Sequence, residues 1–192
     1  MTRDSYALER AEKVLRRIEE LAKIEYLPII GPDRGRALAE LVAQLKPKRI
    51  VEVGTLVGYS TIMMGKELGS DAEIITIEIH REEAKTALRN IKEAGIKPKV
   101  HVIVGDASKI LPTLRGRFDF VFLDGYKNEY LRHLKSIEGK LHLGSTVVAD
   151  NAGVYAYSMR DYLNYVRNSG RYKSSFIKVG SDGIEVSVKI SD

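Results

Sequence analysis

Polar residues at two points of the chain have the types and spacing of a cation site. Asp124 ends an apolar run at Phe118–Asp124, and Asp150 with Asn151 ends another at Thr146–Asp150. Two carboxylates and an amide oxygen suit a hard divalent cation, Mg²⁺ first and Mn²⁺ or Ca²⁺ as substitutes. Each aspartate alone could instead cap the next helix. Two such strand-end positions, one followed by asparagine, favour the metal.

Lys127 stands three residues after Asp124 and could bring its amine beside such a cation. A lysine near a divalent cation and away from bulk water should lose its proton more readily than the reference pKa of about 10.4 implies. It could then act as a base toward a hydroxyl group. The competing interpretation is a solvated surface lysine, because the segment Lys127-Asn128-Glu129 is charged.

A glycine-containing turn follows the apolar run Arg49–Val53, with Gly54 and Gly58 four residues apart. Ligands of open α/β sheets bind past the carboxyl ends of the strands, where glycines let the backbone approach them. The turn lacks both the dinucleotide fingerprint and the phosphate-loop motif. The carboxylate of Glu52 would repel a pyrophosphate but suits the cationic α-amino group of an amino-acid-bearing ligand. A generic strand-to-helix turn is the alternative.

Two later strand ends supply further ligand-binding candidates. Glu78 lies near the end of the run Glu73–Ile79, where an acidic residue can bind both hydroxyls of a ribose. That role does not separate adenosine from NAD, and an exposed strand-end charge is the alternative. Asp106 follows the next run and lies near the expected base of a nucleoside. Helix capping by Asp106 or Ser108 competes with this role.

The elements that must position these residues alternate along the chain. Short β-branched runs are separated by helix-like segments, and strands joined by helical crossovers are parallel. At the C-terminus, Ser174–Val179 and Ile184–Ile190 are joined by Gly180–Gly183, which favours a hairpin, and the second run alternates as one buried face requires. We predict an α/β, doubly wound, Rossmann-like seven-stranded sheet with five parallel strands, a C-terminal antiparallel hairpin and helices on both faces. The five parallel runs are 49–53, 73–79, 99–104, 118–124 and 146–150.

A helical segment precedes this alternation. Ala7–Ile24 carries a hydrophobic stripe at helical spacing with charged residues opposite, so residues 1–30 are predicted to form a helical docking segment. The same helix could join a homodimer interface. A second helix is expected to run from Asp33, as its N-cap, to Leu45. No linker marks a boundary, so residues 1–192 are expected to form one domain.

Composition narrows the function classes further. The 192 residues include no cysteine, which excludes disulfides, thiolate metal sites and cysteine nucleophiles. The N-terminus lacks the apolar core of a secretion signal, and no apolar run approaches the roughly 20 residues of a membrane span. We therefore expect a cytoplasmic protein with no membrane partner. A net charge of +5 would favour an anionic partner, but basic and acidic residues are interspersed.

Several of the candidate residues belong to longer motifs. These read Val51-Glu52-Val53-Gly54-Thr55-x-x-Gly58-Tyr59-Ser60-Thr61, then Glu78, then Gly105-Asp106, then Phe122-Leu123-Asp124-Gly125-x-Lys127. With these motifs, the chain from about Ile30 to the C-terminus resembles metal-dependent O-methyltransferases of the catechol and caffeoyl-CoA type. The resemblance implies an enzyme that binds S-adenosylmethionine and transfers its methyl group to a hydroxyl oxygen.

The resemblance also assigns roles to single residues. The family residues that surround S-adenosylmethionine match Ile30, Glu52, Gly54, Ser60, Glu78, Ala107 and Ser108. To these we add, from their places in the turns and at a strand end, Gly58, Asp106 and Asp124. The family's metal ligands match Asp124, Asp150 and Asn151. Its catalytic base matches Lys127, with Asp124 beside it in the catalytic site.

The acceptor is less clearly indicated. Family members that act on catechol carry a glutamate after Ser-Phe, and this chain has Ile177 there. We predict a small hydroxylated acceptor, aromatic and vicinal-diol-like, on which Tyr126, Tyr155 and Tyr157 could stack. The alternative acceptor is a hydroxyuridine of tRNA, as in related bacterial proteins, and the basic pI favours it. An NAD-dependent dehydrogenase and a non-catalytic S-adenosylmethionine-binding protein are the remaining alternatives.

Overall fold

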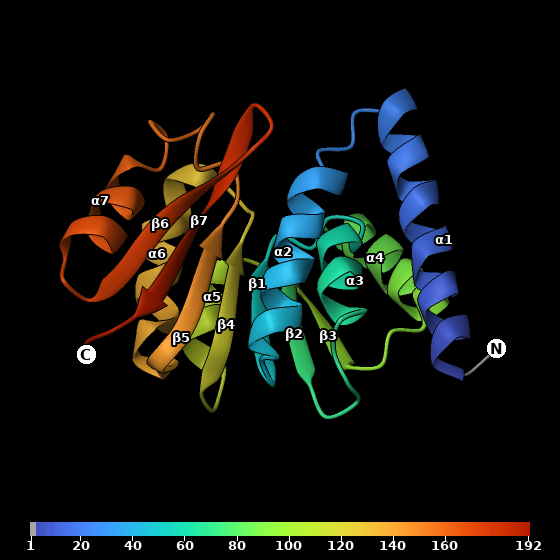
Figure 1. Cartoon of the computed structure of the whole chain (residues 1–192), viewed down its shortest axis with the longest axis horizontal. Helices are drawn as coiled ribbons and strands as arrows, with labels where there is room; N and C mark the ends of the chain where they lie inside the picture. Colours follow the sequence, from blue (N-terminus) through green and yellow to red (C-terminus); the bar gives the residue numbers. More distant parts are fainter. Residues whose placement is uncertain (1–2) are drawn as a thin grey trace.

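Seven strands form one mixed sheet in the order β3-β2-β1-β4-β5-β7-β6 (Figure 1). The computed structural model describes residues 3–192. The first five strands pair in parallel, and β7 pairs antiparallel with β5 and β6. The strands are β1 (Arg49–Val53), β2 (Glu73–Glu78), β3 (Lys99–Val104), β4 (Phe118–Leu123), β5 (Leu141–Ala149), β6 (Tyr172–Val179) and β7 (Asp182–Lys189). The predicted fold class is confirmed.

Helices cover both faces of this sheet (Figure 1). They are α1 (Arg3–Ile24), α2 (Pro32–Leu45), α3 (Tyr59–Gly65), α4 (Arg81–Ala94), α5 (Ala107–Ile110), α6 (Tyr130–Ile137) and α7 (Arg160–Asn168). Successive strand residues point to opposite faces. In β1, Ile50 therefore joins the core under α1 to α4, whereas Val51 joins the core under α5 to α7. Burial on both faces explains why these strands are continuous hydrophobic runs.

Helix α1 packs on α3 and α4 at one end of the molecule. Its buried stripe includes Ala11 and Leu15. The hydroxyl of Tyr59, at the start of α3, donates a hydrogen bond to Glu19 of α1 at 2.5 Å. The helix thus contacts the segment that follows the glycine turn. Residues 1 and 2 of the predicted docking segment lie outside the described residues.

The start of α2 differs from the prediction. Gly31 is the N-cap, with φ 79°, and Pro32 is the first helical residue. Proline suits this position because its missing N–H would have no partner there. Asp33 therefore lies in the first turn, where it pairs with Arg36 instead of capping the helix.

Strand β7 differs in a more informative way. The predicted alternation holds, but the polar face is buried as well as the apolar one, because β7 lies between β5 and β6 and α7 packs against it. Glu185 accepts hydrogen bonds from Nε of Arg167 at 2.8 Å and from its terminal nitrogen at 2.6 Å. The hairpin turn itself is shorter than predicted, since β7 already begins at Asp182.

Candidate active site

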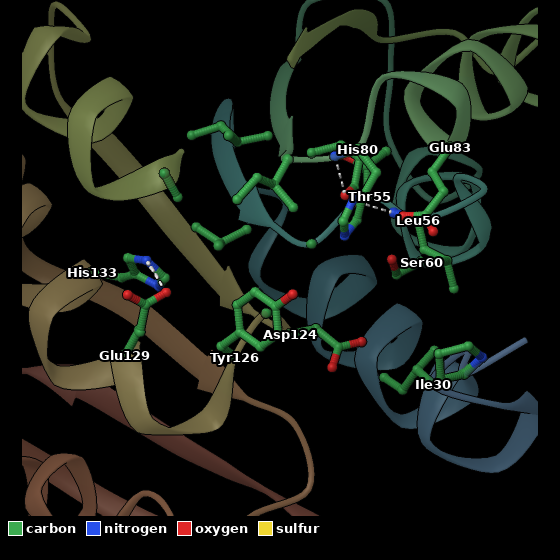
Figure 2. Close-up of a pocket in the computed structure, with 18 of the residues that line it drawn as sticks. Ile30, Thr55, Leu56, Ser60, His80, Glu83, Asp124, Tyr126, Glu129 and His133 are labelled. Atoms are coloured by element: carbon green, nitrogen blue, oxygen red, sulfur yellow. Dashed lines mark hydrogen bonds and ion pairs between the residues drawn. The ribbon is translucent and has the colours of Figure 1, made fainter. Parts of the chain in front are cut away.

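The carboxyl ends of the parallel strands open onto one cavity of about 450 Å³ (Figure 2). Its lining includes seven of the predicted cofactor residues, namely Ile30, Gly54, Ser60, Glu78, Asp106, Ala107 and Asp124. Three other predicted residues do not line it, namely Glu52, Gly58 and Ser108. The topology alone brings these segments together, because parallel strands end at the same edge of the sheet.

The two positions of the turn require glycine for different structural reasons. Gly54 has φ 97°, and a Cβ at this position would lie 2.5 Å from the carbonyl oxygen of Asp124. Any side chain would push the turn away from the end of β4. Gly58 has φ 86° and lets the start of α3 approach Ile91 of α4. Gly54 thus shapes the cavity wall, and Gly58 serves the packing behind it.

Glu52 lies beneath the turn and is fully buried. Its carboxylate accepts hydrogen bonds from the hydroxyls of Ser60 and Thr61. Burial raises the pKa of Glu52, and these hydroxyl contacts oppose the rise. Glu52 therefore meets the cavity through Ser60, which lines it, and not directly.

Glu78 ties the turn to the end of β2. One carboxylate oxygen accepts from the backbone N–H of Leu56 at 2.7 Å, and the other accepts from that of His80 at 3.0 Å. Ligand atoms of Glu78, His80 and Glu83 lie within 4.8 Å of one another. Burial, and then the charge of Glu78, raises the pKa of Glu83. This wall of the cavity is therefore acidic.

Asp106 caps α5, which was the competing interpretation of this residue. Its Oδ1 accepts from the backbone N–H of Ser108 at 2.9 Å and from the Ser108 hydroxyl at 2.6 Å. These hydrogen bonds lower the pKa of Asp106. Asp106 still lines the cavity, as does Ala107, whereas Ser108 is occupied by the cap.

The two aspartates of the predicted metal site lie on neighbouring strand ends, Asp150 with a side chain only 1% exposed and Asp124 with one 14% exposed. Burial, and then the charge of Asp124, raises the pKa of Asp150 to about 7. Burial also raises the pKa of Asp124. Arg34 Nε donates to Oδ1 of Asp150 at 2.7 Å and offsets part of this repulsion. Sequence reasoning missed Arg34.

Asn151 has the left-handed backbone conformation, with φ 60°. Its amide nitrogen donates to Oδ2 of Asp182 at 2.8 Å, so its amide oxygen is the atom left for a cation. Asp182 also accepts from the backbone N–H groups of Gly153 and Val154 at 3.0 and 2.9 Å. The hairpin turn therefore anchors the loop that carries Asn151, a role that its turn composition did not reveal.

Lys127 begins a 3₁₀ turn, Lys127–Glu129, directly after the Asp124 strand end. Its amine donates to Oδ1 of Asp124 and contacts the hydroxyl of Tyr130, both at 2.8 Å. Tyr130 is fully buried, and its hydroxyl donates to the backbone carbonyl of Asp150 at 3.4 Å. The structure thus brings Asp124, Lys127 and Asp150 together, with Tyr130 as an unpredicted link.

His133 of α6 also lines the cavity, together with Glu129 (Figure 2). The four histidines of the chain share no spacing, so the sequence alone indicates only surface or packing roles for them. His133 is 2% exposed, and neither ring nitrogen has a hydrogen-bond partner within the described part of the chain. A lone histidine on a helix gives no sign of this before the cavity is known.

Comparison with known proteins identifies the family. A family model described as O-methyltransferase matches residues 4–162. The chain belongs to this family. This agrees with the resemblance found in the sequence motifs and sets aside the dehydrogenase alternative.

Individual members of the O-methyltransferase family are similar over most of this chain. Catechol O-methyltransferase B of Danio rerio is 36% identical over 177 residues, which are 85% of this chain and 66% of that protein. This chain therefore spans slightly less than two thirds of that relative's length. A putative O-methyltransferase from Klebsiella pneumoniae superposes with a TM-score of 0.82 at 26% identity, covering 93% of this chain and 90% of that one.

The O-methyltransferase TomG from Streptomyces achromogenes, involved in tomaymycin synthesis, was solved in complex with SAM. It superposes with a TM-score of 0.80 at 26% identity, covering 96% of this chain and 90% of that one. Across residues 3–192 of the chain, no helix has the length and apolarity to cross a membrane.

Proposed function

We propose that this chain is an S-adenosylmethionine-dependent O-methyltransferase that uses a divalent cation and methylates a hydroxyl group of a small acceptor. The observation that carries the proposal is the grouping of Asp124, which lines the cavity, with Lys127, which contacts it, and Asp150 at the neighbouring strand end. TomG, a structural relative, holds SAM, and the Danio rerio relative is named for catechol. These names favour a small acceptor over tRNA.

The cavity walls would hold the cofactor in three parts. Glu78 would bind the ribose hydroxyls, next to the turn it already anchors. Ser60, oriented by Glu52, and the backbone at Gly54 would bind the amino-acid part, with Ile30 beside it. Asp106 would lie by the base, in a wall formed with Ala107.

The donor set of Asp124, Asp150 and Asn151 fits a hard cation, Mg²⁺ first. Burial raises the pKa of both carboxylates, and the charge of Asp124 raises that of Asp150 further, so a positive charge is favourable at this site. The amide nitrogen of Asn151 is used by Asp182, which leaves oxygen as the third donor atom. A cation held here would polarise the acceptor hydroxyl and favour loss of its proton.

Lys127 is the residue we assign to take that proton. Its amine lies between Asp124 and Tyr130, so the two 2.8 Å contacts hold it in one position. The acceptor oxygen would then bond to the methyl carbon of S-adenosylmethionine as the bond from that carbon to sulfur breaks, and S-adenosylhomocysteine would leave. The chain's main contribution is to hold these atoms in line, about 3–3.5 Å apart.

Exposed aromatic side chains provide a surface for the acceptor. Tyr126 lines the cavity, and Tyr155 and Tyr157 are exposed on the segment after Asn151. Their rings suit a planar acceptor of the vicinal-diol type. Ile177 remains the departure from the catechol pattern and is partly exposed. A cytoplasmic location and a homodimer remain predictions.

The direct test is transfer of labelled methyl groups to a panel of dihydroxyphenols, monophenols and total tRNA, with Mg²⁺ or with EDTA. We expect turnover of a phenolic acceptor that EDTA abolishes. Lys127→Ala should lower kcat by about 100-fold or more, while S-adenosylmethionine affinity changes by less than about twofold. Lys85→Ala, an exposed lysine of α4, is the matched control. Equal loss of turnover and cofactor affinity in Lys127→Ala would contradict its role as the base.

A further inference from the structure

One end of the cavity carries polar side chains that the proposed function leaves unused. Glu129 and His133 lie one helical turn apart, at the junction of the 3₁₀ turn and α6. In Figure 2 they lie together on the side of the cavity opposite Ile30 and Ser60, with Tyr126 and Asp124 between. Leaving a buried imidazole without a hydrogen bond is unfavourable, so its position on a cavity wall indicates a ligand that supplies the partner.

The contacts of this pair leave specific atoms for that ligand. Nε2 of His133 lies 3.8 Å from Oε2 of Glu129, which is too far for a hydrogen bond. The other oxygen of Glu129 accepts from Arg132 at 3.3 Å. Burial lowers the pKa of His133 and keeps its ring neutral, so the ring offers one N–H donor and one acceptor nitrogen.

The order of groups along the cavity indicates which part of a ligand reaches this pair. The proposed function assigns the ribose to Glu78 and the amino-acid part to the turn at Ser60. The base must then extend to the other side. Ile79, Ala107 and Tyr126 line the cavity and offer apolar surfaces for a flat ring, and Figure 2 shows Tyr126 between Glu129 and Asp124. The edge of that ring would meet Glu129 and His133.

We propose that Glu129 and His133 select the adenine base by its amino-bearing edge. The carboxylate of Glu129 accepts a hydrogen bond from the 6-amino group, and the ring N–H of His133 donates to the adjacent ring nitrogen. A 6-oxopurine would bring its carbonyl oxygen against the carboxylate, and this repulsion excludes it. This specificity rests on the proposed function, because it requires that the cavity holds S-adenosylmethionine.

The test compares binding of S-adenosylhomocysteine with binding of its hypoxanthine counterpart, S-inosylhomocysteine, to the full chain by calorimetry. The wild type should bind the adenine compound at least about 100-fold more tightly, because the 6-oxo compound leaves buried polar groups unpaired. Glu129→Gln should reduce this preference to less than about tenfold, because an amide can donate to the 6-oxo group. His133→Phe should weaken adenine binding. Ser136→Ala, on the same helix but outside the cavity lining, should keep the full preference.

The outcomes separate the two proposals. If the wild type binds both compounds equally and still transfers methyl groups, the adenine specificity is wrong and the proposed function stands. If Glu129→Gln keeps the full preference, the pair does not read the base. If the wild type binds neither compound, the proposed function fails and the specificity fails with it. Glu129 is only partly buried, so its variant remains informative even if His133→Phe does not fold.

Discussion

At the amino ends of the parallel strands acidic side chains are paired with basic ones, whereas at the carboxyl ends of the same strands they face each other. Glu73 of β2 accepts from Arg49 at 2.9 Å, and this contact lowers its pKa. Asp119 of β4 accepts from His142 at 2.9 Å and from two backbone N–H groups, and although burial opposes them these bonds lower its pKa.

The carboxyl ends show the reverse pattern. Burial raises the pKa values of Glu52, Asp124 and Asp150, and the last two repel each other. The positive charges of Arg34 and Lys127 offset only part of the rise in the pKa of Asp150. One end of the sheet is thus arranged for stability, and the other keeps negative charge where a bound cation can relieve it. This contrast supports the proposed cation site independently of any relative.

The largest expected effect distinguishes the two ends by activity. Asp150→Asn should lower kcat at least about 100-fold, because a lost cation forfeits several kcal/mol of transition-state stabilisation. Asp119→Asn, the same change at the other end, should stay within about twofold of the wild type. Methyl-transfer assays at saturating Mg²⁺ measure both. Equal losses in the two variants would mean that Asp150 contributes through folding and not through the site.

A second effect distinguishes the ends by pH. The pKa of Asp150 in the folded state, about 7, lies above its ordinary value, so the folded state binds more protons than the unfolded state between about pH 4 and 7. When EDTA removes divalent cations, the free energy of unfolding should therefore fall as pH rises, by roughly 1–2 kcal/mol between pH 6 and 8. The lowered pKa values of Glu73 and Asp119 act oppositely and cost stability only as pH falls below about 4.

Urea unfolding in EDTA at pH 6 and pH 8 measures this slope. Asp150→Asn should flatten it, because the amide does not titrate. Asp119→Asn should lower the slope only slightly, because the part that it removes is the smaller one from His142, whose pKa Asp119 raises. A wild type without this slope would show that Arg34 and Lys127 keep Asp150 ionised across this pH range.

The sequence was sufficient for the fold because β-branched runs and their spacing reflect burial on both faces of a parallel sheet. The predicted bounds of the runs at 49–53 and 99–104 match β1 and β3. It was also sufficient to bring Asp124 and Asp150 to one edge, since topology alone dictates that. The burial of Glu185 could not be predicted in this way, because it depends on the insertion of β7 between β5 and β6.

The supporting contacts of the site could not be predicted in the same way. Arg34 reaches Asp150 across 116 positions of sequence, and Asp182 reaches Asn151 across 31. Such contacts depend on side-chain placement after folding, and no local pattern encodes them. His133 is the extreme case, because its lack of a partner is itself the informative property.

The smallest expected effect tests the stabilising end alone. Asp119 raises the pKa of His142, so this pair stabilises the fold fully below the ordinary histidine pKa of about 6.5 and ceases to do so as pH rises through the raised value. Both side chains are about one third exposed, so His142→Asn should cost under about 1 kcal/mol at pH 6 and nearly nothing at pH 9. Urea unfolding at the two pH values measures this, with methyl transfer unchanged. A loss of activity in His142→Asn would show that the amino ends of the strands are coupled to the site after all.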